Sequence, residues 1–252
     1  MKLDQKEEGK RRQALFRRGE FDRALASINQ SIQHSPNDSL LYRERAHIYL
    51  YLGETQKARA DFDLTQKLQE KTFHTKPGQL QSDGEITAIG VTYWMEGHRD
   101  LAISFWRYAT TSLIANRVHY ADMGGGFETG LILWFGAACE RNGDDTALVK
   151  QFYEKRLAST HWSHSLTSWP GPIVRFFLNR IDADKLIQSA EECGQKLCSA
   201  HFAVAARSRE TRRYAMCKKH LKKAAGENIE VDMYDFYNVL PFFVARFEVG
   251  MQ

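Results

Sequence analysis

The sequence predicts an all-α solenoid of about five to six helix pairs, because one short pattern occurs in it twice at a fixed distance. Gly19 recurs as Gly53 and Ala24 recurs as Ala58, each 34 residues later. Apolar residues before and after each glycine fall at helical spacing, so each copy is predicted to be a helix, a tight turn and a second helix. A period of this length indicates a repeat array that forms one stack of helix pairs.

The same pattern can be followed further along the chain. Gly97 lies 44 residues after Gly53, and Gly143 lies 46 residues after Gly97. A weaker unit follows around Arg180, and the last unit turns at Arg212, which replaces the glycine. We therefore expect the later units to be longer and more degenerate than the first two.

These units resemble the tetratricopeptide repeat (TPR), whose signature has a small residue and an aromatic before the turn glycine and a proline that closes the unit. Pro36 supplies that proline in the first copy, whereas Glu70 stands there in the second. The resemblance is clear over residues 5–70 and 83–112, and it becomes degenerate over residues 128–225.

The resemblance implies that residues 1–252 form a single TPR-like domain, a right-handed superhelical solenoid. A repeat stack needs a covering element at its end, and the aromatic-rich residues 231–249 are predicted to be a C-terminal capping segment over the last unit. The alternative is that this segment is exposed and docks a partner.

Composition and charge narrow the class of protein. The 252 residues are 43% hydrophobic and carry a formal net charge of +4. Residues 1–12 are charged and lack the apolar core of a signal peptide, and the most apolar run, 130–139, is about half the length that crosses a bilayer. The four cysteines form no CxxC pair, which favours reduced thiols. We expect a cytoplasmic protein without a membrane partner.

The first helix of each pair lines a concave, ligand-holding groove in the TPR family. The resemblance therefore implies partner contacts from first-helix positions of this chain. Those positions include Arg17, Arg43, His47, Tyr51, Trp94 and Arg141. Aromatic and arginine side chains carry much of the binding energy of protein interfaces. The alternative is that Tyr51 and Trp94 pack between repeats.

Three enlarged connections, at residues 72–82, 116–127 and 159–171, separate the predicted helix pairs. In a stacked array such loops emerge along one edge, and insertions on one face often form the binding face. Histidine and aromatic residues of these loops are therefore further candidates for partner binding. They are His119, Tyr120, Trp162, His164 and Trp169.

Positive charge is concentrated in residues 207–223, which contain eight Lys or Arg and one Glu. Such a concentration could bind nucleic acid or an acidic protein, and the structural alternative is a solvated outer helix face. No zinc-finger, RNA-recognition or helix-turn-helix signature accompanies the charge. An acidic protein is therefore the favoured partner, and nucleic acid is not expected.

Loop histidines are the residues that an enzyme would have to use. His161 and His164 share one loop, and His119 lies near Asp122 in another, so they could form a metal-dependent site if the loops meet. Their spacing matches neither HExxH nor a Cys/His quartet. We therefore expect no catalytic residue, no metal and no cofactor.

Together these patterns predict a non-enzymatic protein-binding protein that uses the groove and the enlarged loop edge. The resemblance is compatible with an adaptor, an effector chaperone or a toxin-neutralising immunity protein, and the immunity role fits the idiosyncratic loops best because neutralisation needs one complementary surface. The alternatives are nucleic-acid binding through residues 207–223 and a metal-dependent enzyme built on the loop histidines. An uncapped repeat face could also pair with a copy of itself, forming a homo-oligomer.

Overall fold

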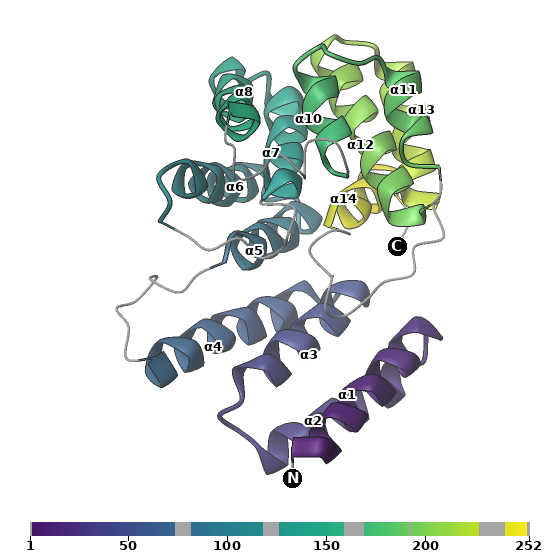
Figure 1. Ribbon diagram of the computed structural model, residues 1–252. Helices are drawn as coiled ribbons and strands as arrows, with labels where there is room; N and C mark the ends of the chain where they lie inside the picture. Colours follow the sequence, from purple (N-terminus) through teal and green to yellow (C-terminus); the bar gives the residue numbers. More distant parts are fainter. Residues whose placement is uncertain are drawn as a thin grey trace. The chain divides into compact units, whose positions relative to one another are not determined.

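The computed structural model describes residues 2–73, 82–117, 126–158, 169–191, 193–226 and 240–250 (Figure 1). Within these ranges there are thirteen helices and no strand, and the helices pack in neighbouring pairs. The all-α class predicted from the sequence is therefore confirmed. No helix in the described part of the chain is long and apolar enough to cross a membrane.

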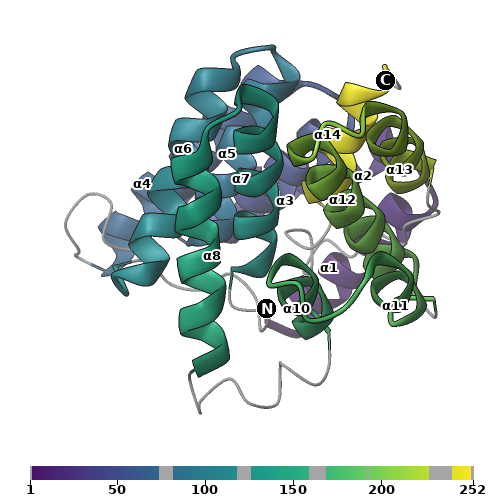
Figure 2. The same cartoon turned by 90° about the horizontal axis from the view of Figure 1, so that it is seen from above.

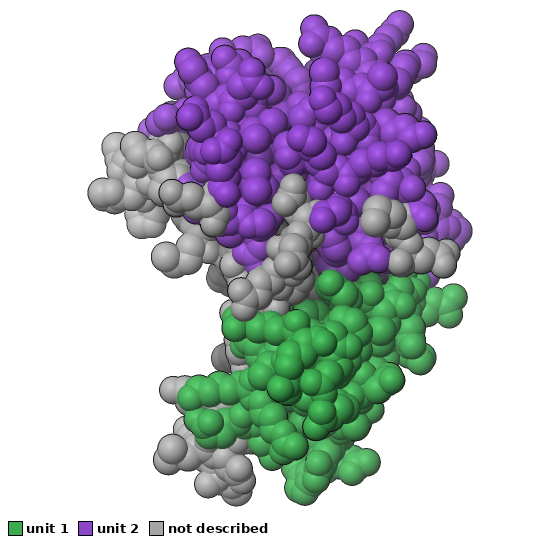
Figure 3. Space-filling model, turned by 90° about the vertical axis from the view of Figure 1, so that its right-hand side faces the viewer, with its two compact units in different colours: residues 1–81, 230–236 green, residues 82–229, 237–252 purple. Residues whose placement is uncertain are grey.

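The chain divides into two compact units, drawn in green and purple in Figure 3. Unit 1 comprises residues 1–81 and 230–236, and unit 2 comprises residues 82–229 and 237–252. Each unit has its own buried hydrophobic core.

Unit 1 consists of two helix pairs. They are α1 (Lys2–Arg17) with α2 (Phe21–His34), and α3 (Ser39–Tyr51) with α4 (Thr55–Phe73). Helix α2 packs on both α1 and α3, and α3 packs on α4. Ala24 and Ile28 are buried, as are their counterparts 34 residues later, Ala58 and Phe62. The positions that repeat in the sequence thus form the core of this unit.

Two ion pairs connect the helices of unit 1. The guanidinium of Arg12 on α1 donates to the Glu44 carboxylate on α3 at 3.0 and 3.1 Å, and both side chains are at most 10% exposed. Arg45 of α3 donates two hydrogen bonds, of 2.7 and 2.8 Å, to Asp61 of α4. Burial raises the pKa of Glu44, and the Arg12 charge opposes that shift. The ionisation of Glu44 therefore depends on Arg12.

Unit 2 contains the remaining helices. They are α5 (Asp83–Met95), α6 (Arg99–Ile114), α7 (Phe127–Glu140), α8 (Gly143–Ala158), α10 (Gly171–Phe177), α11 (Ala183–Gln188), α12 (Gly194–Glu210), α13 (Tyr214–Gly226) and α14 (Leu240–Glu248). Four pairs follow the chain, α5 with α6, α7 with α8, α10 with α11 and α12 with α13, and α7 also packs on α6 and α12 (Figures 1 and 2).

A residue with positive φ separates the two helices of every pair described. These residues are Gly19, Gly53, Gly97, Arg141, Asn179 and Arg212. At each turn the following backbone N–H donates to the carbonyl five residues earlier, for example Glu20 to Leu15 at 3.0 Å and Arg213 to Ser208 at 2.7 Å. This is the Schellman arrangement, which satisfies the last carbonyls of a helix. The pairs therefore share one turn geometry.

The fourth turn lies two residues before the position that the glycine pattern predicts. The pattern places it at Gly143, but the left-handed residue is Arg141, with φ 58°. The side chain of Asn142 accepts a hydrogen bond from the Asp144 N–H at 3.1 Å and so caps α8. Gly143 is consequently the first residue of that helix. The spacing from Gly97 becomes 44 residues, the same as the preceding interval.

The C-terminal helix α14 covers more than the last helix pair. Residues 231–239 of the predicted capping segment lie outside the described residues, but α14 packs on α12 and α13 and also on α5 and α7 (Figures 1 and 2). Glu248 accepts hydrogen bonds from Trp94 Nε1 and from Arg99, both of 3.0 Å. In its described part the C-terminal segment therefore covers the last helix pair, as expected, and it also covers the first helices of two earlier pairs.

Candidate partner-binding surface

The predicted groove positions of unit 1 differ in their exposure. Arg17 is exposed, whereas Arg43 and Tyr51 are half-buried. Tyr51 packs edge-on against Phe16, with ring centroids 5.3 Å apart. His47 is buried and lies against Phe62 in the core. His47 is therefore a core residue, and the structure does not present it to a partner.

The predicted groove positions of unit 2 show the same division. Trp94 is fully buried, stacks on Trp106 with ring centroids 5.3 Å apart, and donates its indole N–H to Glu248 of α14. The burial of Trp94 supports the packing alternative, because the C-terminal helix α14 of the same chain covers the face of α5 on which a partner would have to lie. Arg141 is exposed at the turn between α7 and α8.

Of the five loop candidates, one lies among the described residues. Trp169 is half-buried just before α10. The other loop candidates, His119, Tyr120, Trp162 and His164, lie outside the described residues. Convergence of the three enlarged connections on one edge remains a prediction.

The basic stretch 207–223 forms the end of α12, the following turn and most of α13. Most of its cations are exposed, as the outer-face alternative expects. Six of its eight cations also line one of two cavities, each of which involves residues from other parts of unit 2. The structure therefore supplies binding geometry that the sequence pattern alone did not contain.

The larger cavity, which we call the α11–α13 cavity, has a volume of about 520 Å³. Helices α10, α11, α12 and α13 line it. Its apolar wall consists of Phe176, Ile187, Val204 and Met216, and its charged lining consists of Arg207, Arg213, Lys219, Lys223 and Asp184. Arg207 is paired with Glu210 at 3.0 Å, which leaves three cations and one carboxylate beside the apolar wall. This lining suits an anionic ligand with an apolar part.

Helical spacing explains which lysines reach this cavity. Lys219 and Lys223 are four residues apart on α13 and line it, because positions i and i+4 share a helix face. Lys218 and Lys222 are also four residues apart and exposed, but they are not among the lining residues. The four lysines thus form two pairs of equal charge, one at the cavity and one away from it.

A buried histidine pair lies between helices α12 and α13. His201 Nδ1 and His220 Nδ1 are 3.1 Å apart, and His220 also lines the α11–α13 cavity. Burial, together with the neighbouring His220 and Lys223, lowers the pKa of His201 to about 4. Burial, Lys223 and Lys219 lower the pKa of His220. Both rings are therefore neutral at pH 7, with one donating a hydrogen bond to the other.

This pair predicts a pH-dependent stability of unit 2. The folded-state pKa of His201 is below the ordinary value of 6.5, so the folded state is fully stable above pH 6.5 as far as this pair is concerned. That stability is lost as the pH falls from 6.5 toward about 4, because the unfolded state binds protons first. Melting followed by tryptophan fluorescence should therefore show a falling Tm over this range. The double variant His201→Gln, His220→Gln should show a shallower pH dependence, and an unchanged slope would contradict this assignment.

The smaller cavity, which we call the arginine cavity, has a volume of about 200 Å³ and lies between the α7–α8 turn and the α12–α13 turn. Its polar lining includes Arg141, Asn142, Thr146, Arg209, Arg212 and Tyr214. The structure thus brings a predicted groove residue, Arg141, together with two arginines of the basic stretch. Nothing in the sequence pattern indicates that these turns meet, although arginine at the Arg212 turn is a visible departure from the glycine pattern.

Two of the described cysteines, Cys139 and Cys217, are not activated. Burial raises the pKa of Cys139, at the wall of the arginine cavity, to about 12, with the Glu248 charge acting in the same direction. Burial likewise raises the pKa of Cys217 to about 11. Both thiols are protonated at neutral pH, and a thiol in that form is a poor nucleophile. In the described part of the chain, no three His, Cys, Asp or Glu side chains are grouped as a metal site.

Comparison with known proteins supplies no function for this chain, so the proposed function rests on the geometry of the two cavities. No protein-family model matches the sequence, and no curated protein matches it.

Proposed function

We propose that this chain is a non-enzymatic protein-binding protein of the TPR-like solenoid type, and that its partner is an acidic protein. The α11–α13 cavity is the observation that carries the proposal, because it combines Arg213, Lys219 and Lys223 with an apolar wall. The shared Schellman turn between the helices of each pair supports the repeat architecture. An adaptor, an effector chaperone and a toxin-neutralising immunity protein are all roles of this kind.

The chemistry of the cavity defines the ligand. Lys219, Lys223 and Arg213 are exposed at its rim, so they can pair with carboxylates without the large desolvation cost of a buried charge. Met216, also exposed, and Ile187 offer apolar contact beside them. A segment that alternates acidic and apolar side chains satisfies both features.

The two lysine pairs of α13 provide a matched test. We expect Lys219→Gln with Lys223→Gln to weaken binding of a labelled peptide of Asp, Glu and Leu by about tenfold, which corresponds to about 1.4 kcal/mol. Lys218→Gln with Lys222→Gln removes the same charge away from the cavity. It should change the affinity less than twofold, because salt screens exposed charges that do not contact the ligand. Fluorescence anisotropy titrations at two salt concentrations measure both.

The same variants test the partner itself. The chain should retain one acidic protein from its source lysate after nuclease treatment, and the Lys219/Lys223 variant should lose it while the Lys218/Lys222 variant keeps it. Equal loss in both variants would show that net charge, not the cavity, is responsible. Retention that disappears with nuclease would favour the nucleic-acid alternative, which predicts a steep salt dependence.

A further inference from the structure

The arginine cavity is separate from the α11–α13 cavity and has its own chemistry. Arg141 comes from the α7–α8 turn, and Arg209 and Arg212 come from the end of α12 and the turn after it. These turns are about 70 residues apart in the sequence, and the packing of α7 on α12 brings them together. Three arginine residues therefore line one cavity of about 200 Å³.

The backbone at two of these arginines is unusual. Arg141 and Arg212 have φ values of 58° and 59°, at turn positions that glycine occupies in the first three helix pairs. The left-handed region is costly for a residue with a Cβ, whereas glycine adopts it freely. Turn geometry therefore does not favour arginine at either position. Both arginines line the same cavity. A role in that cavity would explain why arginine stands at two turns where glycine suits the backbone better.

The positive charge of the cavity is not neutralised within the described residues. None of Arg141, Arg209 and Arg212 forms an ion pair there, and Arg209 lies over the ring of Tyr214 at 5.0 Å. The lining carboxylate, Glu210, is already bound, because it accepts hydrogen bonds from Trp134 Nε1 at 3.2 Å and from Arg207 at 3.0 Å. An anion entering the cavity would therefore find three lining arginines that have no carboxylate partner among the described residues.

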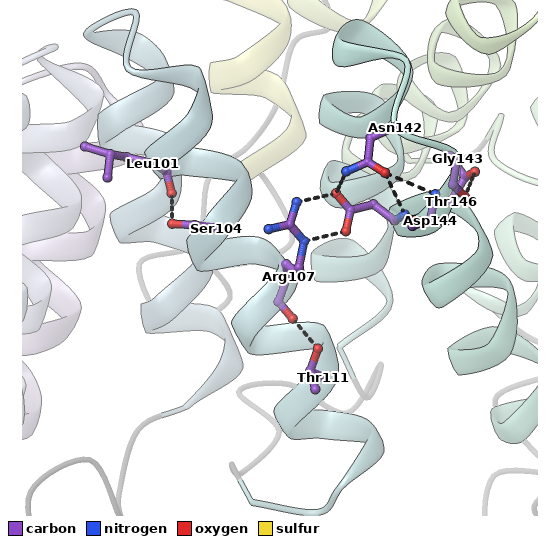
Figure 4. A network of polar contacts seen from close by, with 9 residues as sticks. Leu101, Ser104, Arg107, Thr111, Asn142, Gly143, Asp144 and Thr146 are labelled. Atoms are coloured by element: carbon purple, nitrogen blue, oxygen red, sulfur yellow. Dashed lines mark hydrogen bonds and ion pairs between the residues drawn. The ribbon is translucent and has the colours of Figure 1, made fainter.

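The turn that carries Arg141 is held in place by a polar network (Figure 4). Arg107 of α6 donates two hydrogen bonds, of 2.6 and 2.7 Å, to Asp145 at the start of α8. This contact raises the pKa of Arg107. Asn142 donates to the same carboxylate at 2.9 Å and caps α8 through the Asp144 N–H. The cavity wall is thus preorganised, which reduces the entropy cost of binding.

We propose that the arginine cavity binds a phosphate-sized oxyanion. Guanidinium groups match the oxygens of a phosphoryl group with paired, charge-assisted hydrogen bonds. The charge of three arginines suits a doubly charged phosphate ligand better than a singly charged carboxylate ligand. Tyr214 lines the same cavity, and its hydroxyl can donate to a remaining oxygen, whereas the Thr146 hydroxyl already donates to the Gly143 carbonyl at 2.9 Å. The volume admits one such group with its waters. Free phosphate or pyrophosphate and a phosphorylated protein side chain present this same chemistry.

Isothermal titration calorimetry of the full chain in a phosphate-free buffer tests the proposal. The ligands are inorganic phosphate, pyrophosphate, and a phosphoserine peptide beside its unphosphorylated form. We expect saturable binding of at least one phosphoryl ligand. Tighter binding of pyrophosphate would identify a free anion as the ligand, and tighter binding of the phosphopeptide would identify a modified protein. No saturable binding of any of them would overturn the proposal.

Variants separate the cavity from general electrostatics. Arg141→Gly with Arg212→Gly should weaken binding at least tenfold while the Tm stays unchanged or rises, because glycine suits both left-handed turns. Arg209→Gln removes the third guanidinium without altering a turn and should weaken binding about fivefold. Exposed Arg180, which lines neither cavity, supplies the control Arg180→Gln, expected to bind as the unchanged chain does. Full affinity in the glycine variant, or equal loss in the control, would overturn the assignment.

Discussion

Replacing Gly90 by alanine is expected to lower the free energy of unfolding of unit 2 by about 3 kcal/mol. A Cβ at Gly90 would lie 2.6 Å from Trp106 Cδ1 and closer still to its Nε1. Trp106 cannot move aside, because it is fully buried, stacks on Trp94 and lies 3.0 Å from where a Cβ on Gly136 would be. Its indole N–H also donates to the Thr87 carbonyl at 3.1 Å, a bond that a displaced ring would lose.

Chemical unfolding followed by tryptophan fluorescence measures this effect directly, since Trp106 is itself a probe. Gly143→Ala is the matched control. Gly143 is also in a helix, but a Cβ there would meet nothing within 4 Å, so alanine should be neutral or slightly stabilising. Wild-type stability in the Gly90 variant would mean that α5 and α6 can separate without cost, contrary to this account of their packing.

Replacing Arg12 by methionine is expected to destabilise unit 1 by about 3 kcal/mol at neutral pH, because it leaves the buried Glu44 carboxylate without its partner. The same change removes the charge that opposes the raised pKa of Glu44. A raised folded-state pKa means that stability is present at low pH and is lost as the pH rises through that pKa. The defect of the variant should therefore shrink as the pH is lowered from 7 toward 5.

A second substitution distinguishes loss of the partner from loss of packing. Arg12→Met with Glu44→Leu should recover most of the stability, since an apolar pair often replaces a buried ion pair at little cost. Lys10→Met on the same helix removes an exposed ion pair with Glu7 and should have an effect near zero. Equal stability of the single and double Arg12 variants would contradict the assigned role of Glu44.

The tryptophans make the unit that unfolds identifiable. They are Trp94, Trp106, Trp134, Trp162 and Trp169, all within the residue range of unit 2. Far-UV circular dichroism reports the helices of both units. In the Arg12 variant we therefore expect part of the circular dichroism signal to be lost in a transition that tryptophan fluorescence does not follow.

The local elements of this protein were determined by its sequence. Apolar spacing on both sides of Gly53 predicted a helix, a tight turn and a second helix, and the structure has Ser39–Tyr51 and Thr55–Phe73 there. The turns at Gly19, Gly53 and Gly97 were visible for the same reason, because a left-handed residue between two helices is a local requirement that glycine meets best. Arg212 could be placed at a turn only because the spacing of the other units indicated it.

Tertiary structure alone decided which of these residues meet. Trp94 is a core residue because Trp106 and Phe135 pack against it, and Glu248, 154 positions later, accepts its indole hydrogen bond. Arg141 and Arg212 line one cavity because α7 packs on α12. Periodicity assigns a residue to a helix face but does not say which distant helix covers that face, since the free energy of covering it depends on the shapes and charges of side chains far apart in the chain.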